Sequence, residues 1–195
     1  MNTLITPAST SSVSRPFVPE RAFGRGLALL GAGLMLAVFH RALDLSLGLP
    51  GHFGVFWMAA LVLARSASPL PAAALVTALG YLCGGAVLGA HATHGMVNAP
   101  GYLAAALCLD GAWWLAPALL AHPFSAALIG AVAFALKPAL LAVAVAAFEL
   151  KGGALRHGLG VVVLAHACFG GVGAVIGALL WQGQGRSPSG AREPH

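Results

Sequence analysis

The sequence predicts an all-α protein, a polytopic bundle of about six transmembrane helices in one domain. Hydrophobic residues make up 59% of the 195 positions, whereas charged residues make up only 8%. Soluble domains usually carry about 25% charged residues, so this chain has too few to cover a surface that faces water. The net charge of +5 is spread over tails and loops rather than gathered on one face. This pattern argues against a nucleic-acid partner and favours the lipid bilayer as the surroundings of the chain.

Apolar segments of membrane-spanning length follow a polar start. Residues 1–24 are rich in Ser, Thr and Pro and predict a disordered cytosolic tail, and 183–195 predict a second disordered tail. A spanning helix needs about 20 mostly apolar residues. The six-helix domain at 25–182 then contains spans near 25–45, 52–66, 69–90, 100–121, 123–148 and 157–182. The second span is short, so it either crosses with little tilt or begins as a re-entrant segment.

The basic residues orient these spans. With the N-terminus in the cytosol, six arginines fall on the inner side, and three basic residues fall on the outer side. The inner group is Arg15, Arg21, Arg25, Arg65, Arg186 and Arg192, and the outer group is Arg41, Lys151 and Arg156. The positive-inside rule therefore favours a cytoplasmic N-terminus. The expected location is a bacterial inner membrane.

Two charged residues, Asp110 and Lys137, lie near the middle of expected spans. An ionisable residue at mid-helix is costly in a bilayer and marks a functional site with a nearby partner. Because the spans at 100–121 and 123–148 are joined by a very short turn, we expect them to be antiparallel and to pair the two charges. The pair is either a structural link between two helices or part of a substrate or ion site. Pro138 follows Lys137 and predicts a kink beside it.

Histidine is unusually frequent, with eight residues against five acids. Neutral imidazole is a common ligand of transition-metal ions, so His40, His91 and His94 are candidate metal ligands near the outer side. The alternatives are loop histidines that only form hydrogen bonds, or histidines that line a pocket for a small organic molecule. Neither a GxSxG nor a Walker-type motif occurs, so no enzymatic activity and no ATP site of its own are expected.

Several features resemble the substrate-binding (S) component of energy-coupling-factor (ECF) transporters. They are the six spans, the pair Ala28 and Ala32, the loop LGLPGHFGVFW at 47–57, the segment Asn98 to Tyr102, and the last helix HACFGGVGAVIGALL at 166–180. The resemblance implies capture of a vitamin-like small molecule or a metal ion on the outer side. Metal-specific members of this family begin with Met-His, whereas this chain begins MNT.

The same resemblance implies partners and a site. Ala28 and Ala32 would contact a transmembrane coupling subunit, which would in turn bind ATPase subunits. The expected substrate-binding residues are His52, Asn98, Tyr102, Asp110, Lys137 and His166. No cofactor is expected apart from a possible bound transition-metal ion. The alternatives are a self-sufficient small permease or metal carrier, and a membrane assembly factor that binds metal through its histidines.

Overall fold

A computed structural model describes residues 19–43, 50–89, 95–148 and 157–184. These residues form helices and connecting turns, and no strand occurs among them. The helices are α1 (Pro19–Leu43), α2 (Gly54–Ala67), α3 (Ala73–Val87), α4 (Gly95–Leu115), α5 (Pro117–Ala121), α6 (Pro123–Phe148) and α7 (Leu159–Gly183). The predicted all-helical class is therefore confirmed for the described part of the chain.

Three of these helices are long and apolar enough to cross a membrane. They are α1 over Glu20–Ala42, α6 and α7, with mean hydropathies of 1.8, 2.2 and 2.2. The helices α2 and α3 are also apolar but have only 14 and 15 residues. Together with the composition, these helices indicate a membrane protein.

The helix boundaries agree with the prediction at some places and differ at others. The span expected at 123–148 coincides with α6, whereas α1 begins at Pro19 rather than at residue 25. The span expected at 100–121 is wrong at both ends, because α4 begins at Gly95 and ends at Leu115. Ala116 is extended, with φ −160° and ψ 95°, and the following Pro117 begins the short α5. A residue before proline disfavours the helical conformation, which explains the break.

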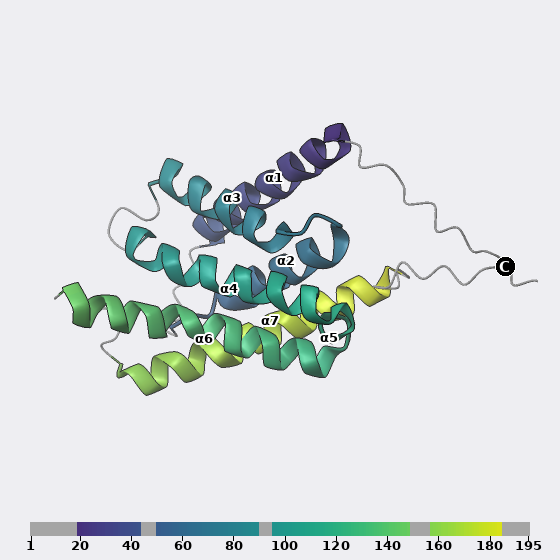
Figure 1. The fold of residues 1–195 in the computed structure, drawn as a ribbon. Helices are drawn as coiled ribbons and strands as arrows, with labels where there is room; N and C mark the ends of the chain where they lie inside the picture. Colours follow the sequence, from purple (N-terminus) through teal and green to yellow (C-terminus); the bar gives the residue numbers. More distant parts are fainter. Residues whose placement is uncertain (1–18, 44–49, 90–94, 149–156, 185–195) are drawn as a thin grey trace, which may run out of the picture.

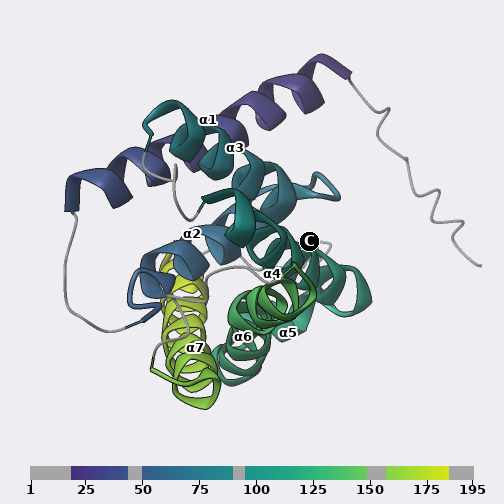
Figure 2. The ribbon, with the colours of Figure 1, turned by 90° about the vertical axis from the view of Figure 1, so that its left-hand side faces the viewer.

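The six longer helices alternate in direction along the chain (Figure 1), and α1 crosses α6 and α7 at a steep angle (Figure 2). Helix α2 lies in the middle, between α7 on one side and α3 and α4 on the other, and α6 packs against both α4 and α7. Helix α1 is peripheral and lies along α3, away from α6 and α7 (Figure 2). The core is formed where α2, α3, α4 and α6 meet and includes Trp57, Tyr81, Leu109 and Phe134.

Glycines sit where helices approach most closely. A Cβ atom on Gly80 of α3 would collide with the backbone of Leu30 in α1, and one on Gly33 would collide with the backbone of α3. Gly173 and Gly177 of α7 pack in the same way against the backbone of α2. Small residues let helices pack by close contact where lipid supplies no hydrophobic driving force, and these glycines lie at such contacts.

Ala28 and Ala32 of α1 behave differently from these glycines. Both are exposed, whereas Leu29, Gly33 and Leu36 of the same helix are buried. The alanine pair therefore lies on a face of α1 that does not pack against α3.

Candidate ligand-binding cavity

A cavity of about 160 Å³ lies at the end of the bundle where α1 ends and α2 begins. Four of the longer helices and the turn before α2 contribute to it. Its lining consists of His40, Gly51, His52, Phe53, Gly54, Trp57, Tyr102, Phe134 and Lys137. Charged, aromatic and imidazole groups from distant parts of the chain therefore meet in one small space.

The turn before α2 lies close to α6 and α7 because one glycine lies in the turn and another begins α2. Gly51 has a φ of +81°, a conformation that L side chains rarely adopt. A Cβ atom there would also come within 2.8–2.9 Å of the His166 ring. At Gly54 a side chain would collide with the ring of Phe134. The two glycines thus let the backbone of this turn sit directly on α6 and α7.

Three aromatic rings form one wall of the cavity. The ring of Trp57 lies 4.9 Å from that of Tyr102 and 5.7 Å from that of Phe134, measured between centroids. Trp57 has no exposed surface, and its indole Nε1 has no hydrogen-bond partner among the described residues. The wall is therefore largely apolar.

Lys137 supplies the positive charge of the cavity. Its Nζ atom donates a hydrogen bond of 2.9 Å to the Tyr102 hydroxyl and lies 4.3 Å from the centroid of the Tyr102 ring. Within the described part of the chain, the ion pair that forms joins Arg65 to Asp110 and does not involve Lys137. The ammonium group is thus held by an aromatic ring and a hydroxyl rather than by a carboxylate of these residues.

Polar groups continue from Lys137 to α1. The Tyr102 ring packs against the ring of Tyr81 of α3, with centroids 5.3 Å apart, and the Tyr81 hydroxyl lies 2.6 Å from Nδ1 of His40 in α1. The imidazole of His40 stacks on Phe53, with centroids 3.7 Å apart and planes 12° apart. Two hydrogen bonds and the ring contact between them therefore connect side chains of α6, α4, α3 and α1.

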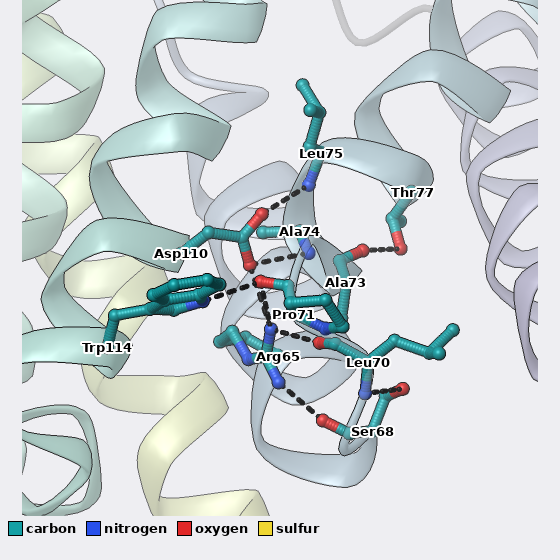
Figure 3. Close-up of polar contacts among 10 residues, drawn as sticks. All are labelled: Arg65, Ser68, Leu70, Pro71, Ala73, Ala74, Leu75, Thr77, Asp110 and Trp114. Carbon is teal, nitrogen blue, oxygen red and sulfur yellow. Dashed lines mark hydrogen bonds and ion pairs between the residues drawn. The ribbon is translucent and has the colours of Figure 1, made fainter. Parts of the chain in front are cut away.

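Asp110 lies near the other end of the bundle, away from the cavity. Its carboxylate pairs with the Arg65 guanidinium at 3.1 Å and accepts hydrogen bonds from the backbone N–H groups of Ala74 and Leu75 at 3.1 and 2.9 Å (Figure 3). These groups belong to the first turn of α3, where Ala72 provides no side-chain cap. Asp110 therefore caps α3 from a different helix and neutralises part of its N-terminal dipole.

Arg65 is the centre of this cluster and is only 1% exposed. Besides Asp110, its guanidinium donates hydrogen bonds to the backbone carbonyls of Ser68, Leu70 and Pro71 (Figure 3). Trp114 donates to the Pro71 carbonyl as well, at 2.9 Å. The cluster fixes the connection between α2 and α3 against α4.

The expected pair between Asp110 and Lys137 is therefore wrong. A Cβ atom on Gly101 would lie 2.6 Å from Cα of Lys137, so Lys137 lies opposite Gly101 in α4. Asp110 is nine residues further along that helix. This separation corresponds to about 13 Å at 1.5 Å per residue. The expected register assumed a tight turn between the two helices, whereas α5 lengthens the connection.

The structure brings together some of the predicted site residues and separates others. His40, His52, Tyr102 and Lys137 line the cavity, whereas Asp110 does not. His166 lies behind the lining, where its ring is 5.0 Å from that of Phe134 and its Nδ1 donates to the Val162 carbonyl at 2.8 Å.

The remaining predicted residues have other places. Asn98 lies inside α4, one turn before Tyr102, rather than at the helix N-cap. His91 and His94 fall outside the described residues. Among the residues that are described, no group of three or more His, Cys, Asp or Glu side chains is placed to hold a metal ion.

Sequence reasoning missed Arg65, Trp57 and Phe134 as members of these two sites. Arg65 was assigned only to the inner side by its charge, although its place just before the Ser-Pro-Leu-Pro connection is a signal for a residue that binds loop carbonyls. Trp57 and Phe134 could not be distinguished from packing residues by sequence.

Compared with known proteins, the chain matches no family model, no curated protein and no solved structure.

Proposed function

We propose that this chain is the membrane-embedded capture subunit of an ATP-driven importer of the ECF type, and that it binds a small organic molecule in the cavity. The observation that carries this proposal is the cavity itself, in which a half-buried ammonium group meets three aromatic rings at one end of the bundle. Small-molecule sites are typically concave and mostly apolar, with a few well-placed polar groups. Of the predicted substrate-binding residues, His52, Tyr102 and Lys137 belong to this cavity.

In this proposal the chain crosses a bacterial inner membrane six times. The cavity opens towards the outer side, and the Arg65–Asp110 cluster lies near the cytosol. Helix α1 then presents Ala28 and Ala32 to a transmembrane coupling subunit, because both are exposed away from α3. Small residues on an exposed helix face allow a partner helix to approach closely in lipid.

An organic molecule fits the cavity better than a metal ion does. Two histidines, His40 and His52, contribute to the lining, and His40 already contacts the Tyr81 hydroxyl through Nδ1. No cysteine or carboxylate is present in the described lining. Lys137 would also repel a cation in the same space.

The partner prediction can be tested by affinity purification of the tagged, full-length chain after gentle solubilisation, followed by mass spectrometry. We expect the wild type to recover a second membrane subunit together with ATPase subunits. A variant with Ala28→Leu and Ala32→Leu should lose these partners by about tenfold or more, because the larger side chains block close helix contact. Ala139→Leu, at an exposed position of α6, is the matched control and should keep them.

Recovery of the chain alone from several mild detergents would contradict the proposal. Transport by the purified chain in liposomes would then support the alternative of a self-sufficient permease. Equal loss of partners in the α1 and α6 variants would show that the larger side chains act non-specifically.

A further inference from the structure

The described lining of the cavity offers hydrogen-bond donors without matching acceptors. The Lys137 ammonium group has three N–H donors, of which one is used by the Tyr102 hydroxyl. An ammonium group cannot accept a hydrogen bond. A buried donor without a partner is costly, so a ligand that fills this space gains most if it supplies acceptor oxygens.

The charge of the cavity also favours a ligand with acceptor oxygens. Lys137 lies 15 residues into the 26-residue helix α6, in a largely apolar bundle, and its described partners are an uncharged hydroxyl and the π faces of Tyr102 and Phe134. Ionisable groups inside a membrane are usually paired. No carboxylate in the described lining neutralises this ammonium group. An anionic ligand would complete the pair.

Size and shape limit the ligand further. A cavity of about 150 Å³ accommodates a molecule of the size of benzene, and this cavity measures about 160 Å³. Its wall consists of the planar side chains of Trp57, Tyr102 and Phe134, which prefer offset or edge contacts with another ring. The space therefore suits one flat ring with a small substituent.

From these three observations we infer that the ligand is a single planar ring that carries a carboxylate. The carboxylate lies against the Lys137 ammonium group, and the ring lies against Trp57 and Phe134. This inference rests on the proposed function, because it names the chemical class that the same cavity captures.

Three probes of similar size separate charge from shape. Binding of benzoate, benzamide and cyclohexanecarboxylate is measured by equilibrium dialysis at pH 7.5, with the full-length chain in lipid nanodiscs and with empty nanodiscs as the blank. We expect benzoate to bind at least about tenfold more tightly than benzamide, since a hydrogen bond to a charged group contributes more than 1.4 kcal/mol. Cyclohexanecarboxylate, which has the charge but not the flat ring, should also bind more weakly than benzoate.

Variants then assign the effect to Lys137. Lys137→Met should reduce benzoate binding to the level of benzamide, and Lys137→Arg should keep most of the preference. Arg25→Met removes one positive charge from an exposed position of α1, outside the cavity, and should bind as the wild type does. Elution profiles in detergent establish that each variant is folded.

Several outcomes would overturn the inference. Equal binding of benzoate and benzamide removes the argument from charge, and equal binding of the two carboxylates removes the argument from shape. Benzoate binding that survives Lys137→Met lies elsewhere on the chain, and absence of binding by all three probes rejects this ligand class. The proposed importer function is decided separately, because recovery of the ATPase partners does not depend on these probes.

Discussion

At the residue scale, the contact between Arg65 and Asp110 is a structural link between α2, α3 and α4. Both side chains are buried, and the carboxylate has two further partners in the first turn of α3. Its removal would leave a buried guanidinium group without its counter-charge and two backbone N–H groups without acceptors. Breaking a buried pair of this kind typically costs about 3–5 kcal/mol.

We therefore predict that Asp110→Ala lowers the free energy of unfolding by about 3–5 kcal/mol. Unfolding in mixed micelles with increasing SDS measures this change. Glu20→Gln removes one acid from an exposed position of α1 and should leave the unfolding curve unchanged. Binding by the folded fraction should stay normal, because Asp110 does not line the cavity.

A double-mutant cycle tests whether the two charges depend on one another. The variant with both Arg65→Met and Asp110→Ala should cost less than the sum of the single changes, because it leaves no stranded charge. Additive losses would mean that the two residues stabilise the bundle independently, and the link between them would be rejected.

The candidate site shows what sequence reveals about single residues. Lys137 and Asp110 were recognisable because charges inside apolar runs are costly, and both prove to have specific partners. Their partners were not predictable, since a pairing depends on the register of two helices. Lys137 lies opposite Gly101, nine residues before Asp110 in α4, so the two charges do not meet. Asp110 pairs with Arg65 instead.

At the element scale, sequence was most informative where composition changes sharply. The start of helix α6 was predicted to the residue because Pro123 begins its apolar run. Helix α4 was not, because the apolar run continues past Ala116 and only the following Pro117 marks the break. The peripheral place of α1 depends on tertiary packing and had no signal in its composition.

The packing of α1 on α3 can be tested at one glycine. A Cβ atom on Gly80 would collide with the backbone of Leu30, which cannot rotate away as a side chain can. We predict that Gly80→Ala separates the two helices and lowers the free energy of unfolding by about 1–3 kcal/mol, the usual cost of overpacking. The same SDS titration measures this loss.

Gly26→Ala is the matched control in the same pair of helices. Nothing lies within 4 Å of a Cβ atom at Gly26, and alanine is a better helix former than glycine. This variant should be neutral or slightly more stable. If Gly80→Ala proved as harmless as Gly26→Ala, α1 would not depend on this close contact.

At the scale of the whole molecule, the two ends of the bundle have different chemistry. One end contains the cavity with Lys137, and the other contains the closed Arg65–Asp110 cluster. In this cluster the Arg65 guanidinium donates hydrogen bonds to the backbone carbonyls of Ser68, Leu70 and Pro71, so its polar groups are largely satisfied within the protein. A cavity at one end and a structural cluster at the other agree with the proposed capture of a ligand from one side of a membrane.

The number and direction of crossings form the last prediction. The six longer helices alternate in direction, so the Pro19 end of α1 and the Gly183 end of α7 lie on the same side of the bundle (Figure 1). With six crossings and a cytosolic N-terminus, single cysteines at Ser12 and Ser187 should react with a membrane-impermeant maleimide only after the cells are permeabilised. A cysteine at Thr93, between α3 and α4, should react in intact cells. The background is a variant in which Cys83, Cys108 and Cys168 are replaced by alanine.

Labelling of Ser12 and Ser187 from opposite sides would mean an odd number of crossings. Labelling of both from outside would turn the cavity towards the cytosol, and capture from the outer side would then be rejected.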